Sequence, residues 1–79
     1  MDGHLWHDDE LDYAASNAAQ RFDLDQDRAR DLVGMVSDAF EEGGDAVEDA
    51  PWDVQDADGS VPGEDFVDDV ATSLGYDLS

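Results

Sequence analysis

The 79-residue sequence contains no cysteine, no lysine and no isoleucine. Without cysteine, neither a disulfide nor a thiolate metal site can stabilise the fold, and the redox compartment is left open. No stretch approaches the roughly 20 apolar residues that a helix needs to cross a bilayer. The N-terminal segment also lacks the basic region and apolar run of a signal peptide. We therefore expect one small, soluble, cytoplasmic domain.

Positive charge is also scarce. The chain has 23 acidic residues, 18 Asp and five Glu, against three arginines, which gives a formal net charge of −20. Such a chain repels nucleic acids and anionic membranes, and it complements a basic protein surface. Leu, Val and Phe make up about a fifth of the residues, near the composition at which highly charged chains are disordered. The two tryptophans and the regular spacing of apolar residues favour a folded domain.

Apolar residues at helical spacing predict an all-α domain over residues 1–79, with three main helices at about 8–21, 26–42 and 62–74. The expected core stripes are Leu11, Ala14, Ala15, Ala18 and Phe22; Ala29, Leu32, Val33, Val36, Ala39 and Phe40; and Phe66, Val67, Val70, Ala71 and Leu74. The expected helix-starting residues are Asp8 or Asp9, Asp25, and Pro62 at the first helical position. Gly75 should end the last helix, so that Tyr76 folds back onto the final turn.

The segment at 44–60 is long for a connection in a compact domain. We expect a connection before the last helix, containing at most a short helical turn at residues 45–50. Trp52 and Val54 should fold over the core.

Within this connection, residues 54–65 resemble an EF-hand or dockerin-type calcium loop. Placing Gly59 at the sixth position puts Asp56 third, Asp58 fifth and Asp65 twelfth. The resemblance implies a calcium-binding module with these three aspartates as the metal candidates. It departs from the pattern in having Val54 at position one and a proline upstream, where an entering helix should be unbroken. The alternative is an Asp-Gly turn that leads into the last helix.

Other chemistry has few residues to use. His4 and His7, with Asp8 and Asp9 following, offer imidazole and carboxylate ligands to a divalent metal, although almost any such cluster binds transition metals weakly. The chain has no cysteine or lysine nucleophile, and both histidines lie near the N-terminus. We therefore expect neither an enzyme nor a resident cofactor.

The three arginines are Arg21, Arg28 and Arg30. Asp31 lies three positions from Arg28, and Asp27 lies three positions from Arg30, which predicts local ion pairs on one helix. The alternative is that the arginines form a discrete basic contact for a partner.

In size, charge and lack of catalytic residues, the whole chain resembles small acidic DNA-mimic inhibitors of phages and mobile elements, such as anti-CRISPR and anti-restriction proteins. The resemblance is one of composition. It implies a non-enzymatic protein that binds a basic surface, such as the nucleic-acid groove of a nuclease, CRISPR or restriction complex, and that binds neither nucleic acid nor membrane. The candidate contacts are Asp8, Asp9, Glu10 and Asp12 on the first helix, Asp38, Glu41 and Glu42 at the end of the second, and Asp65, Asp68 and Asp69 on the third.

The absence of lysine and the excess of aspartate also resemble the proteins of a halophile with molar salt in its cytoplasm. Salt at that level shortens the Debye length to about 3 Å and removes most of the self-repulsion. On this alternative the charge is an adaptation, and the chain is a small helical adaptor or regulator of unspecified role.

Overall fold

The computed structural model describes residues 6–76, which form four α-helices and no strand. They are α1 (Asp8–Phe22), α2 (Gln26–Glu42), α3 (Asp45–Ala57) and α4 (Gly63–Leu74). The all-α prediction is confirmed. The prediction of three helices with a long connection before the last one is wrong, because most of that connection folds into α3.

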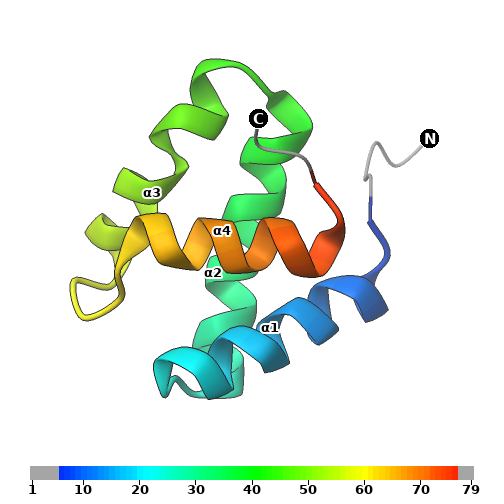
Figure 1. Ribbon diagram of the computed structural model, residues 1–79, viewed down its shortest axis with the longest axis vertical. Helices are drawn as coiled ribbons and strands as arrows, with labels where there is room; N and C mark the ends of the chain where they lie inside the picture. Colours follow the sequence, from blue (N-terminus) through cyan, green and yellow to red (C-terminus); the bar gives the residue numbers. More distant parts are fainter. Residues whose placement is uncertain (1–5, 77–79) are drawn as a thin grey trace.

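The helices pack in a closed ring, in which α1 contacts α2, α2 contacts α3, α3 contacts α4, and α4 contacts α1. Figure 1 shows α2 running along the molecule, with α1 across one end, α3 beside the other, and α4 crossing in front. Helices α4 and α2 also touch where they cross. Within residues 6–76, α1 and α3 do not contact each other. Their outer faces therefore belong to separate parts of the surface.

Helix α3 contains Pro51 in its interior, which is the reason that sequence patterns alone did not predict it. An interior proline lacks the N–H that would bond to the carbonyl of Val47 and costs about 3 kcal/mol in a helix. Packing compensates for this loss, because Ala50 and Val54 on the inner side of α3 are both buried. The expected short turn is in fact a helix of 13 residues.

The core matches the predicted stripes closely. Every predicted residue is buried except Phe22 and Leu74, which lie half-buried at helix ends. Val54 is buried as expected. Trp52 does not cover the core, since 70% of its surface is exposed.

The helix ends agree with prediction to within one residue. Asp25 precedes the first residue of α2 in extended backbone conformation. His7, rather than Asp8 or Asp9, precedes α1, and Pro62 lies one position before α4 rather than inside it. Assignments of helix ends commonly differ by this amount.

The C-terminal end of α4 closes as a Schellman motif, as the sequence predicts. Gly75 has a left-handed φ of 76°, and the N–H of Tyr76 donates to the Ala71 carbonyl at 2.8 Å. The Tyr76 ring stacks on Phe40 of α2, with centroids 4.2 Å apart. Trp6 packs edge-on against both rings and donates its indole N–H to the Leu74 carbonyl at 3.0 Å. This aromatic cluster joins the segment before α1 to the ends of α2 and α4.

A candidate acidic protein-binding surface

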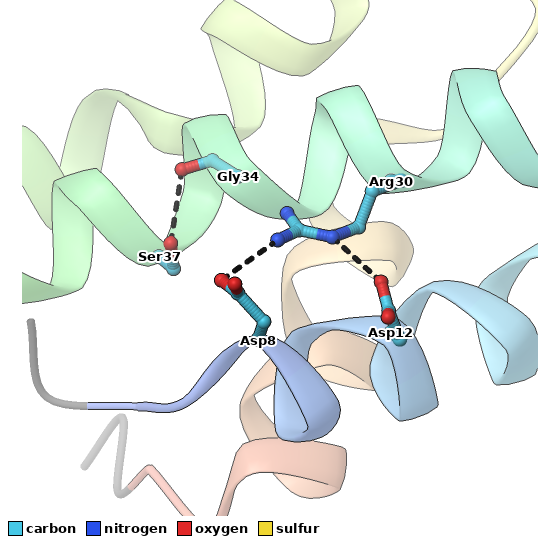
Figure 2. Close-up of polar contacts among 5 residues, drawn as sticks. All are labelled: Asp8, Asp12, Arg30, Gly34 and Ser37. Atoms are coloured by element: carbon cyan, nitrogen blue, oxygen red, sulfur yellow. Dashed lines mark hydrogen bonds and ion pairs between the residues drawn. The ribbon is translucent and has the colours of Figure 1, made fainter.

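Each arginine in the molecule pairs with an acid from a different part of the chain. Arg30 of α2 reaches across to α1, where its Nε donates to Asp12 at 2.9 Å and its Nη2 lies 3.5 Å from Asp8 (Figure 2). The Arg30 guanidinium is thus shared between two carboxylates one helical turn apart. Asp8 and Asp12, both predicted as partner contacts, are partly neutralised within the molecule.

The other two arginines bridge other pairs of elements. Arg21 of α1 donates to Asp69 of α4 at 3.1 Å, and the Asp69 side chain is only 15% exposed. Its second oxygen, Oδ2, is buried and accepts no hydrogen bond within residues 6–76. Arg28 of α2 lies 3.4 Å from Asp58, in the turn after α3. The predicted local pairs with Asp27 and Asp31 are not formed among the described residues, because the arginine side chains instead reach the neighbouring elements.

Asp58 organises the short turn between α3 and α4. Its carboxylate accepts hydrogen bonds from the Ser60 hydroxyl at 2.6 Å and from the Ser60 backbone N–H at 3.1 Å. Three groups lower the pKa of Asp58 below its ordinary value of 3.8. The Ser60 hydroxyl has the largest effect, the Ser60 backbone N–H comes next, and the Arg28 guanidinium adds a smaller one, while burial acts in the opposite direction. This arrangement agrees with an Asp-Gly turn, which is the alternative to a calcium loop in this segment.

The calcium-loop positions do not converge. Val54, the residue at position one, points into the core, and Asp56 lies on the exposed side of α3. Asp58 holds the turn, and Asp65 lies in the first turn of α4. Because α3 continues to Ala57, the turn is shorter than the 12-residue loop that an EF-hand wraps around the ion.

Metal ligands are likewise not assembled elsewhere in the described part of the chain. Residues 6–76 contain no group of three or more His, Asp or Glu side chains placed to hold a metal ion. His7 is exposed at the start of α1, and His4 lies outside the described residues.

The fold places the ten predicted contact acids in three kinds of environment. Asp8, Asp12 and Asp69 are paired with arginines, as described above. The exposed acids without an ion pair within residues 6–76 are Asp9, Glu10, Asp38, Glu42, Asp65 and Asp68. Glu41 is half-buried at the end of α2. The exposed acids lie on three different helices, α1, α2 and α4.

A further acidic face, on α3, was missed in the sequence. Its members are all exposed and have no ion pair within residues 6–76; they are Asp45, Glu48, Asp49, Asp53 and Asp56. The sequence does indicate this face, because it has acids at positions 45, 49 and 56. Their spacing of four and seven residues places them on one side of a helix. The proline at position 51 obscures this pattern, because proline is unfavourable inside a helix.

The one large side chain on this outer face of α3 is Trp52, which is more exposed than Tyr13 of α1 or Met35 of α2. Three acids and one glutamine occupy the positions three and four residues before and after it, namely Glu48, Asp49, Gln55 and Asp56. Residues at this spacing are surface neighbours on a helix. The indole is therefore framed by carboxylates.

None of the helices described between residues 6 and 76 is long and apolar enough to cross a membrane. Comparison of the chain with protein-family models, curated proteins and solved structures finds no match.

Proposed function

We propose that this protein is a non-enzymatic acidic binding protein that engages a basic protein surface. The observation that carries the proposal is the distribution of its cations. All three arginines are engaged in pairs between elements, and within residues 6–76 these pairs involve only four of the acidic residues, Asp8, Asp12, Asp58 and Asp69. A net charge of −20 on so small a molecule produces a field that attracts cationic surfaces and repels nucleic acids and anionic lipids.

The natural targets of such a field are proteins with nucleic-acid-binding grooves. Those grooves carry closely spaced Lys and Arg side chains that neutralise phosphates. Carboxylates held on four helices offer a rigid set of negative charges to the same groove. Mimicry of nucleic acid, directed at a nuclease, CRISPR or restriction complex, is the form of this activity that we favour.

Competition for the groove tests the proposal. Labelled duplex DNA is bound to purified nucleases and to CRISPR or restriction complexes, and the protein is added while fluorescence anisotropy is followed. We expect the DNA to be displaced at physiological ionic strength and displacement to weaken as salt rises. Unfolded poly-aspartate of equal charge is the control, because it carries the charge without the fold. Failure to displace DNA from any basic protein, or equal displacement by poly-aspartate, would refute mimicry by the folded chain.

The composition of the core favours a second explanation of the charge, adaptation to molar salt. Within residues 6–76, seven of the 17 buried apolar residues are alanines, which contribute little buried area to oppose the self-repulsion. The folded state of such a protein becomes more stable when salt screens the repulsion between its carboxylates. Unfolding measurements over a range of salt concentrations, described below, separate the two explanations.

A further inference from the structure

We propose that the outer face of α3 is the surface that contacts the partner, and that its occupant is an arginine-rich segment of a protein. This face, here called the Trp52 face, consists of Asp45, Glu48, Asp49, Trp52 and Asp56. The inference rests on the proposed function, and it specifies where binding occurs and which cation is preferred.

The exposure of Trp52 is fixed by the fold. Ala50 and Val54 hold the opposite side of α3 in the core, at 2% and 0% exposure. With that side buried, the helical period directs Trp52 outward, and 70% of its surface is left in solvent. A tryptophan at the centre of a well-anchored helix face is the residue type most enriched at the energetic centres of protein interfaces.

The arginines of the chain do not compete for this face. They pair with Asp8 and Asp12 on α1, with Asp69 on α4 and with Asp58 in the turn. No acid of the Trp52 face has an ion pair within residues 6–76. The face therefore combines an uncovered aromatic ring with carboxylates whose charge is not neutralised internally.

Charge complementarity selects the occupant. A second copy of the chain would bring two acidic faces together, and a nucleic acid would bring phosphates, so both are repelled at moderate salt. A guanidinium group can stack on the indole while neighbouring groups form bidentate hydrogen bonds with carboxylates. Lysine has a compact, strongly hydrated charge and cannot form the bidentate pair. Arginine-rich protein is therefore the chemistry that fits the ring and the acids together.

Binding of two peptides of identical length and spacing, one with arginines and one with lysines, tests the inference. We expect the protein to bind the arginine peptide more tightly, by up to about fivefold, which is what a whole cation–π contact at an exposed site contributes. Trp52→Ala should reduce this preference, because only the bidentate bonds to the carboxylates remain, and the exposed Tyr13→Ala on α1 should leave it unchanged. Trp52 fluorescence should change on binding in a Trp6→Phe variant, in which Trp52 is the only indole.

A matched pair of charge variants locates the contact. Asp45→Asn/Asp49→Asn removes two exposed acids four positions apart on α3, and Asp27→Asn/Asp31→Asn removes two at the same spacing on α2. Both variants change the net charge equally, so a purely long-range attraction weakens equally in each. We expect the α3 variant to lose at least about threefold more affinity, with circular dichroism confirming that both are folded.

The outcomes distinguish a failure of the Trp52 face as the binding surface from a failure of the acidic binding function. Equal loss in the two charge variants, or an arginine preference that Trp52→Ala leaves undiminished, would overturn the Trp52 face and leave the acidic binding function standing. No binding of either peptide at physiological ionic strength would overturn both. Self-association through Trp52, detected by sedimentation and lost in Trp52→Ala, would replace the arginine-rich partner with a second copy.

Discussion

At the scale of single residues, hydrogen bonds and ion pairs assign different tasks to chemically identical aspartates. Asp58 and Asp56 are two positions apart, yet Asp58 accepts two hydrogen bonds from Ser60 and lies beside Arg28. Asp56 lies exposed on the outer side of α3. One aspartate is part of the fold, and the other belongs to the surface that we propose to bind a partner.

The structural role of the Asp58 carboxylate can be measured by titration. The pKa of Asp58 is depressed in the folded protein, so its contribution to stability is present above its unfolded pKa and is lost as pH falls through the lower, folded value. We expect NMR titration to give Asp58 a pKa below 3.8, and Ser60→Ala to raise it, because the Ser60 hydroxyl is the main cause of the shift. An Asp58 pKa that is unchanged in the variant would show that the hydroxyl does not hold the carboxylate.

At the scale of elements, the junction of α3 and α4 determines whether the third helix can dock. Gly63, the first residue of α4, is buried against the backbone of α3 at Pro51. A Cβ at position 63 would lie 2.0 Å from the Pro51 carbonyl oxygen, which is backbone and cannot rotate away. Glycine is required here by the close approach of two helices.

Gly63→Ala should therefore destabilise the protein. Overpacking costs about 1–3 kcal/mol, or more where backbone must shift. In a domain of this size each kcal/mol lowers Tm by about 4–8 °C, which thermal denaturation followed by circular dichroism resolves. Gly59→Ala is the control, because the nearest atom to its added Cβ is 3.9 Å away and its φ is not in the left-handed region. Equal Tm values for the two variants would mean that α3 and α4 are not in close contact at this point.

At the scale of the whole molecule, a small core opposes a large charge. The 23 acidic residues share an accessible surface of 4909 Å² with only three arginines. Each of the ion pairs is at least partly exposed, and such pairs contribute at most about 1 kcal/mol. Self-repulsion is therefore only slightly relieved within the molecule, and screening by salt must contribute to stability.

Raising salt from physiological to molar concentration shortens the Debye length from about 8 Å to about 3 Å. We expect Tm to rise with added NaCl by at least about 4–8 °C, equivalent to a gain of about 1 kcal/mol. The Tm of the Asp31→Asn/Asp38→Asn variant should rise less with added NaCl, because that variant carries less charge to screen. A Tm that is constant or falls with salt would contradict a stabilising role for screening. A chain already folded at physiological salt favours the mimic, and a chain that needs molar salt favours the halophile.

Prediction from the sequence succeeded where the signal was local. The stripe of α2 and its start after Asp25 follow from the order of neighbouring residues. Helix α3 was missed because Pro51 is locally unfavourable, and the packing of Ala50 and Val54 that offsets it involves other helices. The acidic site was predicted on α1, α2 and α4, but the face of α3 was missed together with its helix.

The sequence by itself determined the sign and size of the charge, the helical fold class and nearly all of the core residues. These depend on composition and on a helical period that spans only a few residues. Only the tertiary structure decided which acids meet arginines and which tryptophan is left exposed. The arginine hydrogen bonds to Asp12 and Asp69 join residues 18 and 48 positions apart, and packing leaves Trp52 uncovered while Trp6 closes on Phe40 and Tyr76. Contacts at such separations are set by how the helices dock against one another, which no local pattern specifies.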